Sequence, residues 1–598
     1  MKDVASEVNK ILKNYLEGNK KIAYSKLKKI SKVYPANQKL RFNLAFMEQD
    51  QGDMYSAKKS YIELINEFNN FNSKINLYNI LLREKNYYKS LELINDILNT
   101  NKDLINVLID KAYINYKIKE YNLSKEICYS ILKKQKNNIQ ALNLLGLCFF
   151  KEKKYEDSIH YQLEGLKVDS KDISILNSLG EIYFELRKLE ESEKYYLTAL
   201  EINPDSYRTI NNLAGFYLET NDSEKAIKLY KKALEIFPDE PTILENISKA
   251  YFSLNESEIA KELTKKALKI RSSASGKKLM SFIYFKDKKF TKGWKYFDGR
   301  LEEDNFIYKN NSYNLIKEKL LHQRKIDPNK KLLIIREQGV GDEILYGSMY
   351  KNVLENFENT YIEADERLIN LFVNSFGKNF SKNFFKLGHF SENEANFKKI
   401  DQVLFAGSLG YYFRNSINDF PEKGYLKVDK DQLLKTREDL LIYKKKFKVG
   451  VSWKSFNNQY AEQKSLSLDN FLDLFKLGDI DFFNLQYGDV TKEIQNFKKK
   501  NSVILEVLNK IDLFNDFCSM ASLLKNLDLF ITVSNSTAHL AGALNVKTIL
   551  IKPFNQATFF YWNQTTNKTP WYPSIDLVDG NIILDKKKFI ELVYSKLE

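Results

Sequence analysis

The sequence predicts an array of paired helices followed by an α/β region of two lobes, and three observations support this division. Apolar and small residues recur every 34 residues through the first half of the chain. From Lys331 onwards this period is lost, and short apolar strands alternate with helical stretches, an order that is typical of parallel sheets. A charged helical stretch at 431–446 separates the strands into two groups. We therefore expect two Rossmann-like lobes that face one another across a cleft.

The 34-residue period is carried by several columns of residues. An apolar column comprises Leu64, Leu98, Leu132, Leu166, Leu200, Leu234 and Leu268. A column of small residues, as expected where two helices cross closely, comprises Ser56, Ser90, Ser124, Ser158, Ser192, Ala226 and Ala260. The columns predict helix pairs over 1–305, stacked so that each pair buries the apolar face of the next. The final copy is degenerate, with Trp294 and Arg300 in place of ordinary residues, and we expect it to cap the array.

The period, the small residues and the aromatic positions together resemble the tetratricopeptide repeat, in about eight copies. This resemblance implies a superhelix whose concave groove takes an extended peptide or protein, which is the partner expected for this half. Asn143, Asn177 and Asn211 repeat at 34 residues and share one face. They either line that groove or are simply solvated.

Seven apolar strands are expected after a polar linker at 306–330. The linker ends in Asp327-Pro328-Asn329, a turn signal. The first lobe, 331–445, holds three of the strands, and the second, 446–598, holds the other four and ends in a helix. The expected strands span residues 332–336, 360–364, 402–406, 448–453, 481–486, 527–533 and 547–552.

Composition argues against several classes of protein. The formal net charge is +15, but the basic residues are spread through the chain instead of forming one block, so no nucleic-acid partner is expected. The three cysteines, Cys128, Cys148 and Cys518, form neither a CxxC pair nor a His/Cys cluster, which favours a reducing compartment and argues against structural zinc. The N-terminal stretch lacks a signal-peptide core, and no run approaches the roughly 18 apolar residues of a membrane span. We expect no membrane span, and a cytoplasmic location.

The loop after the first strand, EQGVGD, is the first candidate site. Gly339 and Gly341 fit the first two positions of the dinucleotide fingerprint G-x-G-x-x-G, but Ile344 occupies the third, where close helix packing requires glycine. Glu363, at the end of the next strand, keeps the nicotinamide alternative open. Asp342 has two interpretations: it is a helix N-cap, or it is a carboxylate at the cleft that accepts a proton from a substrate hydroxyl.

A second candidate loop lies after the strand at 527–533. It delivers small polar residues to the start of a helix, namely Ser534, Asn535, Ser536 and Thr537, with His539 following in that helix. Backbone N–H groups and hydroxyls at such a helix start favour an anion, and a diphosphate fits there. The alternative is a simple N-cap with His539 satisfied inside the core.

Five ordered motifs, EQGVGD, GVSWKS, LQYGD, VSNSTAHLAGAL and PWYPS, resemble the glycosyltransferases of the heptosyltransferase type. The likeness is to the form fused to tetratricopeptide repeats, which is related more distantly to protein O-GlcNAc transferases. It covers most of residues 290–575, and the GWKYFDGR segment at the end of the array belongs to the fused pattern. The resemblance implies a GT-B fold, with the acceptor on the first lobe and a nucleotide sugar held mainly by the second.

The same resemblance implies roles for individual residues. Asp342 corresponds to the family's catalytic Asp, a general base, and Lys464 falls where the family places a phosphate-binding Lys. Ser534 stands where the family usually has Asp, which puts the usual sugar contact in doubt. Trp453 follows a strand where a nucleotide could be touched, although lobe packing is its plain alternative. The full set of expected substrate-binding residues is Gln338, Gly339, Gly341, Trp453, Lys454, Lys464, Gln486, Ser534, Asn535, Ser536, Thr537 and His539.

No metal and no cofactor are expected. The two D-x-D sequences, at 429–431 and 479–481, are more simply solvated, so positive side chains and helix dipoles must stabilise a departing diphosphate. The sequence thus predicts a glycosyltransferase that moves a sugar from a nucleotide sugar to a protein acceptor, such as a surface or flagellar protein, or to a lipid-linked or oligosaccharide acceptor. The alternative is an inactive scaffold that acts only through its repeats, and Ser534 in place of Asp is its best support.

Overall fold

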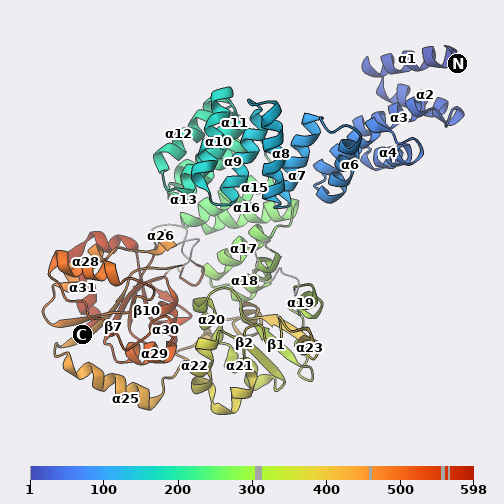
Figure 1. Cartoon of the computed structure of the whole chain (residues 1–598). Helices are drawn as coiled ribbons and strands as arrows, with labels where there is room; N and C mark the ends of the chain where they lie inside the picture. The colour runs from blue at the N-terminus through green and yellow to red at the C-terminus, as the bar shows by residue number, and fades with distance from the viewer. Residues whose placement is uncertain (1, 303–312, 457–460, 554–558, 563–565) are drawn as a thin grey trace. The chain divides into compact units, whose positions relative to one another are not determined.

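The computed structural model describes residues 2–302, 313–456, 461–553, 559–562 and 566–598. Contacts divide the chain into two compact units, Met1–Asn212 and Leu213–Glu598. The boundary falls within the helix α13 (Tyr207–Glu219). The second unit therefore contains the last helices of the array together with both α/β lobes (Figure 1).

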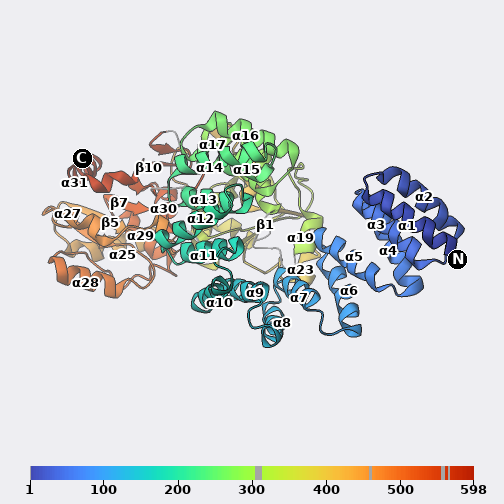
Figure 2. The same cartoon turned by 90° about the horizontal axis from the view of Figure 1, so that it is seen from above.

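The first half of the chain is the predicted solenoid, and its consecutive helices can be followed in Figures 1 and 2. Besides α13, its elements are α1 (Lys2–Leu16), α2 (Lys20–Val33), α3 (Gln38–Asp50), α4 (Met54–Phe68), α5 (Phe71–Arg83), α6 (Tyr87–Thr100), α7 (Ile105–Lys117), α8 (Tyr121–Lys134), α9 (Ile139–Lys151), α10 (Tyr155–Val168), α11 (Ile173–Glu185), α12 (Leu189–Ile202), α14 (Ser223–Ile236), α15 (Pro241–Ser253), α16 (Ser257–Ile270), α17 (Ala274–Lys286), α18 (Phe290–Phe297) and η1 (Asp298–Glu302).

The column of small residues marks the places where two helices of a repeat touch. Ser124, Ser158 and Ser192 are fully buried, and each hydroxyl donates to a backbone carbonyl of the preceding helix at 2.7 to 2.8 Å. Facing them, a Cβ added to Gly180 would lie 2.5 Å from the ring of Tyr196. Small side chains at these positions therefore set the distance between the helices, and the serine hydroxyls are satisfied without water.

The central residue of the asparagine column, Asn177, neither lines a groove nor faces solvent. Asn177 is fully buried, and its Nδ2 donates to the carbonyl of Ile173 at 2.8 Å and to Thr209 Oγ1 at 2.9 Å. Its Oδ1 accepts from Asn212 Nδ2 at 3.1 Å. This amide therefore joins α11 to α13 and is occupied within the solenoid.

The first lobe contains a four-stranded sheet of order β3-β2-β1-β4, in which every pairing is parallel. Its elements are α19 (Tyr313–Lys319), β1 (Leu332–Ile335), α20 (Val340–Gly347), α21 (Tyr350–Asn356), β2 (Thr360–Ala364), α22 (Glu366–Phe376), η2 (Lys378–Asn383), β3 (Phe384–Lys386), α23 (Glu394–Phe397), β4 (Gln402–Phe405), η3 (Ala406–Leu409), α24 (Gly410–Phe413), η4 (Ile417–Asp419), α25 (Lys430–Asp439) and η5 (Leu440–Ile442). Of the predicted linker, residues 306–312 lie outside the described part, and from Ile316 the chain packs on this lobe, with Leu320 pairing with Val403.

The second lobe contains a six-stranded sheet of order β6-β5-β7-β8-β10-β9, parallel except for the β9–β10 pair. Its elements are β5 (Phe447–Ser452), α26 (Ala461–Lys464), η6 (Leu468–Phe471), α27 (Leu472–Phe475), β6 (Ile480–Asn484), α28 (Thr491–Asn501), α29 (Phe517–Lys525), β7 (Leu529–Val533), α30 (Ser536–Ala543), β8 (Thr548–Ile551), β9 (Lys568–Thr569), β10 (Tyr572–Val578), η7 (Gly580–Leu584) and α31 (Lys586–Leu597).

All seven predicted strands form, within two residues at either end, and the predicted fold class is confirmed. Sequence reasoning missed β3, β9 and β10. The strand β3 is only three residues long, and β10 contains Pro573 near its start, so neither gives a clear strand pattern.

The last repeat of the array packs directly on the lobes, within the second unit. Its residues Phe285, Trp294 and Phe297 belong to the same hydrophobic core as Phe560 and Trp571 of the second lobe. The indole Nε1 of Trp294 also donates to the carbonyl of Arg414 at 2.7 Å. The degenerate residues of the predicted cap therefore serve to attach the end of the array to the lobes.

Candidate functional site

The two lobes meet where α20 and α30 pack against each other. A Cβ added to Gly341, in the first turn of α20, would lie 2.9 Å from His539 Cδ2 and 3.4 Å from Ser536 Cα. Glycine is therefore required at position 341 for the close approach of α20 to α30. The second glycine of EQGVGD thus packs against a helix of the other lobe.

A cavity of 320 Å³ opens beside this contact and is lined by both lobes. The sequence-predicted residues that line it are Gly339, Gly341, Asp342, Lys464, Ser534, Asn535, Ser536 and His539. Two loops separated by almost 200 residues in sequence, EQGVGD and VSNSTAH, thus contribute to one cavity.

Asp342 lies half-buried in the first turn of α20. Its Oδ2 accepts from the backbone N of Gly339 at 3.4 Å, and its Oδ1 accepts from the hydroxyl of Tyr561 at 3.2 Å. Gly339, not Asp342, is the N-cap residue of the helix, so the N-cap interpretation of Asp342 is wrong in detail. Burial raises the pKa of Asp342 to about 6, against the opposing effect of both hydrogen bonds.

Lys464, at the end of α26, supplies a cation to the same cavity. The side chain is buried, and its Nζ lies 3.6 Å from the centre of the Phe559 ring. Burial lowers the pKa of Lys464 to about 8, and the charge of Asp342 opposes that shift. The cavity therefore contains both a carboxyl group with a pKa below 7 and an ammonium group with a pKa above 7.

The start of α30 is held by its own side chains. Asn535 Oδ1 accepts from the backbone N of Ala538 at 3.0 Å, which makes Asn535 the N-cap, and its Nδ2 donates to Ser452 Oγ at 2.7 Å. Ser534 Oγ accepts from Trp562 Nε1 at 3.1 Å. Ser536, half-buried, lines the cavity at the first position of the helix.

His539 belongs to an aromatic cluster at the back of the cavity. Its Nδ1 lies 3.1 Å from the hydroxyl of Tyr572, and its ring packs against those of Tyr561 and Trp562. Burial lowers the pKa of His539 to about 3, with Lys464 contributing, so the imidazole is neutral at physiological pH. These contacts agree with the simpler alternative for this loop: Asn535 is the N-cap, and His539 is buried with a hydrogen-bond partner.

Five predicted site residues do not line the cavity: Gln338, Trp453, Lys454, Gln486 and Thr537. Trp453 is fully buried in the core of the second lobe, which is its packing alternative, and Lys454 Nζ pairs with Glu493 at 2.6 Å. Gln486 Oε1 accepts from the backbone N of both Trp453 and Lys454, at 2.9 and 2.6 Å. Gln486 therefore satisfies the backbone of the turn that follows β5.

The remaining two of the five, Gln338 and Thr537, lie outside the cavity lining for other reasons. Gln338 is exposed and has a positive φ of 61°, so its backbone turns the chain into the glycine loop. Thr537 is fully buried, one residue beyond the last cavity-lining position of that turn.

Sequence reasoning missed several residues that line the cavity, namely Arg367, Phe456, Tyr487, Phe514 and Tyr561. The rings of Phe456 and Tyr487 have centroids 5.5 Å apart, and those of Tyr487 and Phe514 are 6.4 Å apart. Arg367 Nη1, from the first lobe, donates to the carbonyl of Phe514 in the second lobe at 3.0 Å. These residues come from separate loops without a periodic pattern, although Tyr487 lies within the LQYGD motif.

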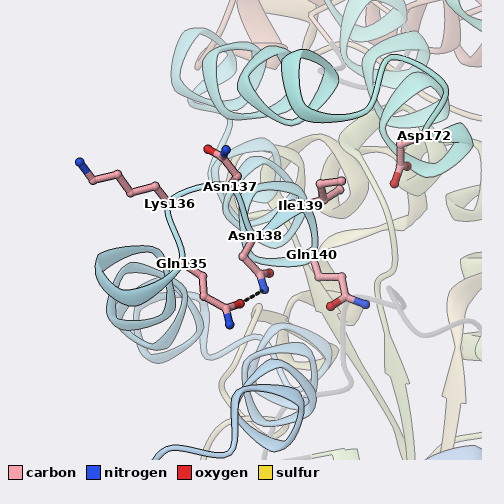
Figure 3. Close-up of a pocket in the computed structure, with 7 residues that line it drawn as sticks. All are labelled: Gln135, Lys136, Asn137, Asn138, Ile139, Gln140 and Asp172. Atoms are coloured by element: carbon pink, nitrogen blue, oxygen red, sulfur yellow. Dashed lines mark hydrogen bonds between the residues drawn. The ribbon is translucent and has the colours of Figure 1, made fainter.

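A separate hollow lies on the first unit, around the turn between α8 and α9 (Figure 3). Asn138 caps α9 by accepting from the backbone N of Ala141 at 3.0 Å, and its Nδ2 donates to Gln135 Oε1 at 3.0 Å. Asp172 caps α11 in the same way, accepting from the backbone N of Ile175 at 2.9 Å. These side chains therefore serve the turns of the solenoid.

Two features are absent from the part of the chain that the structure describes. No helix there is both long and apolar enough to cross a membrane. Within the same residues, no three His, Cys, Asp or Glu side chains gather into a group that could hold a metal ion.

Comparison with known proteins identifies the array. Residues 172–239 match the family described as tetratricopeptide repeat. Protein FlbA of Caulobacter vibrioides is 26% identical over 261 residues, which span 41% of this chain and 42% of FlbA.

Solved structures of two proteins resemble part of the chain. A tetratricopeptide repeat protein from Parabacteroides merdae covers 41% of this chain and 98% of its own, with a TM-score of 0.36 and 17% identity. Yeast Tom70 covers 44% of this chain and 58% of its own, with a TM-score of 0.38 and 14% identity. Together with the 34-residue period, the family match to residues 172–239 shows that the N-terminal half of this chain is built of tetratricopeptide repeats, a fold of protein–protein interaction.

Proposed function

We propose that the protein is a glycosyltransferase of GT-B type, which moves a sugar from a nucleotide sugar to an acceptor hydroxyl without a metal ion. The repeats recruit the acceptor, which we take to be a protein, such as a surface or flagellar protein. A lipid-linked or oligosaccharide acceptor is the alternative. The ordered motifs of the heptosyltransferase type are the sequence basis for this proposal.

One observation carries the proposal: Asp342 of the first lobe and Lys464 of the second line the same cavity, beside the start of α30. A pKa of about 6 suits a general base, because the carboxylate is ionised at neutral pH and still basic enough to accept a proton. A pKa of about 8 leaves Lys464 charged at neutral pH. The two groups therefore have the protonation states that a displacement needs.

The reaction would proceed as a direct displacement. Asp342 accepts the proton of the acceptor hydroxyl while that oxygen attacks the anomeric carbon of the donor sugar. The bond from the anomeric carbon to the diphosphate oxygen breaks, and the diphosphate leaves with the electron pair. Lys464 and the backbone N–H groups at the start of α30 stabilise the charge that develops on it.

The donor nucleotide would occupy the aromatic part of the cavity. Phe456 and Phe514 are partly exposed there, at 46% and 53%, with Tyr487 between them. Flat apolar rings that face solvent offer a stacking surface for a nucleobase. Arg367 lines the cavity near Phe514, but its Nε and Nη2 already donate to Asp365 at 2.8 Å, so Lys464 is the main cation for the diphosphate.

The decisive experiment measures donor binding and turnover separately. Isothermal titration calorimetry with UDP, GDP, CDP and ADP tests the nucleotide site, and release of nucleoside diphosphate from a panel of nucleotide sugars tests turnover. We expect Asp342→Asn to bind nucleotide as the wild type does and to lose turnover by about 100-fold or more. Lys464→Gln should weaken nucleotide binding by about tenfold.

Matched controls are available on the surface. Asp469→Asn and Lys510→Gln change the same residue types in exposed, weakly paired positions and should leave both measurements unchanged. If the wild type binds none of the nucleotides and turns over none of the donors, the proposal is wrong.

A scaffold without catalytic activity is the second candidate. It is favoured by Ser534, whose hydroxyl is engaged by Trp562 at 3.1 Å in the position where the resembled enzymes have Asp. A scaffold keeps its full function in cells when Asp342 is replaced by Asn, whereas an enzyme loses transfer and still binds the donor. Complementation of a deletion strain with the Asp342→Asn gene therefore separates the two candidates.

A further inference from the structure

Tyr561 contacts the carboxylate of the proposed base and is itself fixed on several sides. Its hydroxyl donates to Asp342 Oδ1 at 3.2 Å, and its backbone carbonyl accepts from Thr569 Oγ1 at 2.8 Å. Its ring lies edge-on to that of His539, with centroids 5.0 Å apart. The side chain is 2% exposed, so its place is determined by packing.

The neighbouring residue, Phe560, connects Tyr561 to the last repeat of the array. Its ring contacts three phenylalanines of α17 and α18: Phe282, Phe285 and Phe297, at centroid distances of 5.5, 5.0 and 5.4 Å. All of these residues lie in the second compact unit. The position of Tyr561 therefore depends on a segment that belongs to the helical array.

The same repeat also holds the other side of the Asp342 loop. Arg300, in η1, donates from Nη2 to Glu337 Oε1 at 2.7 Å and to Ser408 Oγ at 3.0 Å. Glu337 follows β1 and precedes the glycine loop, five residues before Asp342, and it also accepts from the backbone N of Gly407. The last repeat is thus connected to the Asp342 loop in two ways: through Phe560 and Tyr561, and through Arg300 and Glu337.

We propose that Tyr561 is a positioning residue for Asp342, and that the last repeat, from α17 to η1, fixes this pair through Phe560. The inference rests on the proposed function, because positioning the carboxylate matters for catalysis only if Asp342 takes the proton. Its consequence is that the last repeat of the array and the catalytic carboxylate are joined by direct packing within the second compact unit.

The pH dependence of turnover gives a readout that simple loss of packing would not change. The charged and titratable groups that act on Asp342 from the surrounding elements are Tyr561, Lys464, Glu337, Tyr346 and Tyr572. Burial raises the pKa of Tyr561 well above its ordinary value, so the hydroxyl stays protonated and acts only as a donor. Because its hydrogen bond favours the ionised form of Asp342, removing it raises the pKa of that carboxyl.

The first test replaces one hydroxyl. In the full-length protein, Tyr561→Phe should lower kcat about tenfold, leave the donor KM within about twofold, and move the acid limb of the kcat profile up by about half a unit to one unit. The donor is the nucleotide sugar that the wild type turns over fastest. Tyr594→Phe is the matched control, since it removes a tyrosine-to-aspartate hydrogen bond of 2.7 Å to Asp479, outside the cavity. An unshifted acid limb in Tyr561→Phe overturns the positioning role.

The second test needs no substrate. Phe282→Ala removes a half-buried ring of the array that stacks on Phe560 and does not contact Asp342. We expect amide hydrogen exchange in Val340–Gly347 and in residues 559–562 to become at least about threefold faster. Tyr284→Ala is the control, because that ring lies on the same helix and stacks on Tyr296 within the repeat. Equal exchange in the two variants overturns the coupling.

The two tests also separate this inference from the proposed function. If the wild type turns over no donor, the glycosyltransferase proposal fails, and hydrogen exchange still decides whether the last repeat holds the Asp342 loop. If the wild type is active and both variants behave like their controls, the proposed function stands and the present inference is wrong.

Discussion

Arg300 and Glu337 form a buried ion pair with two hydrogen bonds, from Nε to Oε2 at 2.8 Å and from Nη2 to Oε1 at 2.7 Å. Both side chains are almost completely buried, at 4% and 0% exposed. Burial opposes the charge on Arg300, but Glu337 and Asp298 outweigh it, so the pKa of the guanidinium is raised. This pair joins the end of the solenoid to the start of the glycine loop.

Replacing Arg300 by Ala leaves the Glu337 carboxylate buried without its main partner. We expect the free energy of unfolding to fall by about 3 to 5 kcal/mol, because a buried charge that loses its partner is strongly destabilising. Urea denaturation followed by tryptophan fluorescence measures this, since all four tryptophans, Trp294, Trp453, Trp562 and Trp571, lie in the second compact unit. Lys277→Ala, which breaks a more exposed pair with Glu302, should cost about 1 kcal/mol or less. A similar loss in both variants contradicts the prediction.

If the proposed function is right, turnover should depend on pH with two limbs. Activity rises through about pH 6 as Asp342 ionises and falls through about pH 8 as Lys464 loses its proton. Steady-state kcat between pH 5 and 10 measures the profile. Lys464→Arg should retain the acid limb and lose the basic limb, because a guanidinium stays charged throughout this range. If the basic limb persists in Lys464→Arg, that limb reports the ionisation of another group.

Asp342→Asn should make the protein more stable at pH 8. The pKa of this carboxyl is raised from 3.8 unfolded to about 6 folded, so its contribution to stability is greatest below pH 4 and is lost as the pH rises through 6. Asparagine does not titrate, which removes this decline and gives a gain of about 3 kcal/mol above pH 7. Melting temperatures of the two proteins at pH 5 and pH 8 provide the measurement. A variant that is less stable than the wild type at pH 8 refutes the assigned pKa.

Gly341→Ala should disturb the contact between the lobes. The added methyl would lie 2.9 Å from His539 Cδ2, so α20 and α30 must move apart, at a cost of about 1 to 3 kcal/mol. Nucleotide binding should weaken with it, because both helices line the cavity. Gly478→Ala is the control: its methyl meets nothing within 4 Å, and the substitution should change neither stability nor binding. Equal effects of the two substitutions would show that the close approach is unimportant.

The regular parts of this structure could be predicted from the sequence because they repeat a local pattern. The 34-residue period predicted the solenoid, and buried apolar runs predicted seven strands. Seven of the eight expected site residues that line the cavity do so because they lie in two segments that follow the carboxyl ends of parallel strands, where such segments converge, and the eighth, Lys464, comes from α26.

The rest of the site depends on contacts between distant segments. Tyr561 lies 219 residues beyond Asp342, in a stretch without helical or strand periodicity, so no local pattern indicates their hydrogen bond. The predictions for Gln486 and Trp453 fail in the opposite way: both residues lie within the motifs, yet backbone N–H groups of a turn engage Gln486 and the core covers Trp453. A polar residue at a strand end can serve either the ligand or the turn, and the sequence alone does not distinguish them.

The contact between α20 and α30 places the amino-terminal turns of two helices from different lobes beside one cavity. Such turns carry partial positive charge, so the two helix ends repel one another, and the carboxylate of Asp342 offsets part of that repulsion. Burying this carboxylate costs more free energy than the attraction supplies, because the pKa of Asp342 is raised. A ligand anion at the two helix ends would add to the attraction that holds the lobes together, so the cohesion of the lobes depends on what occupies the space between them.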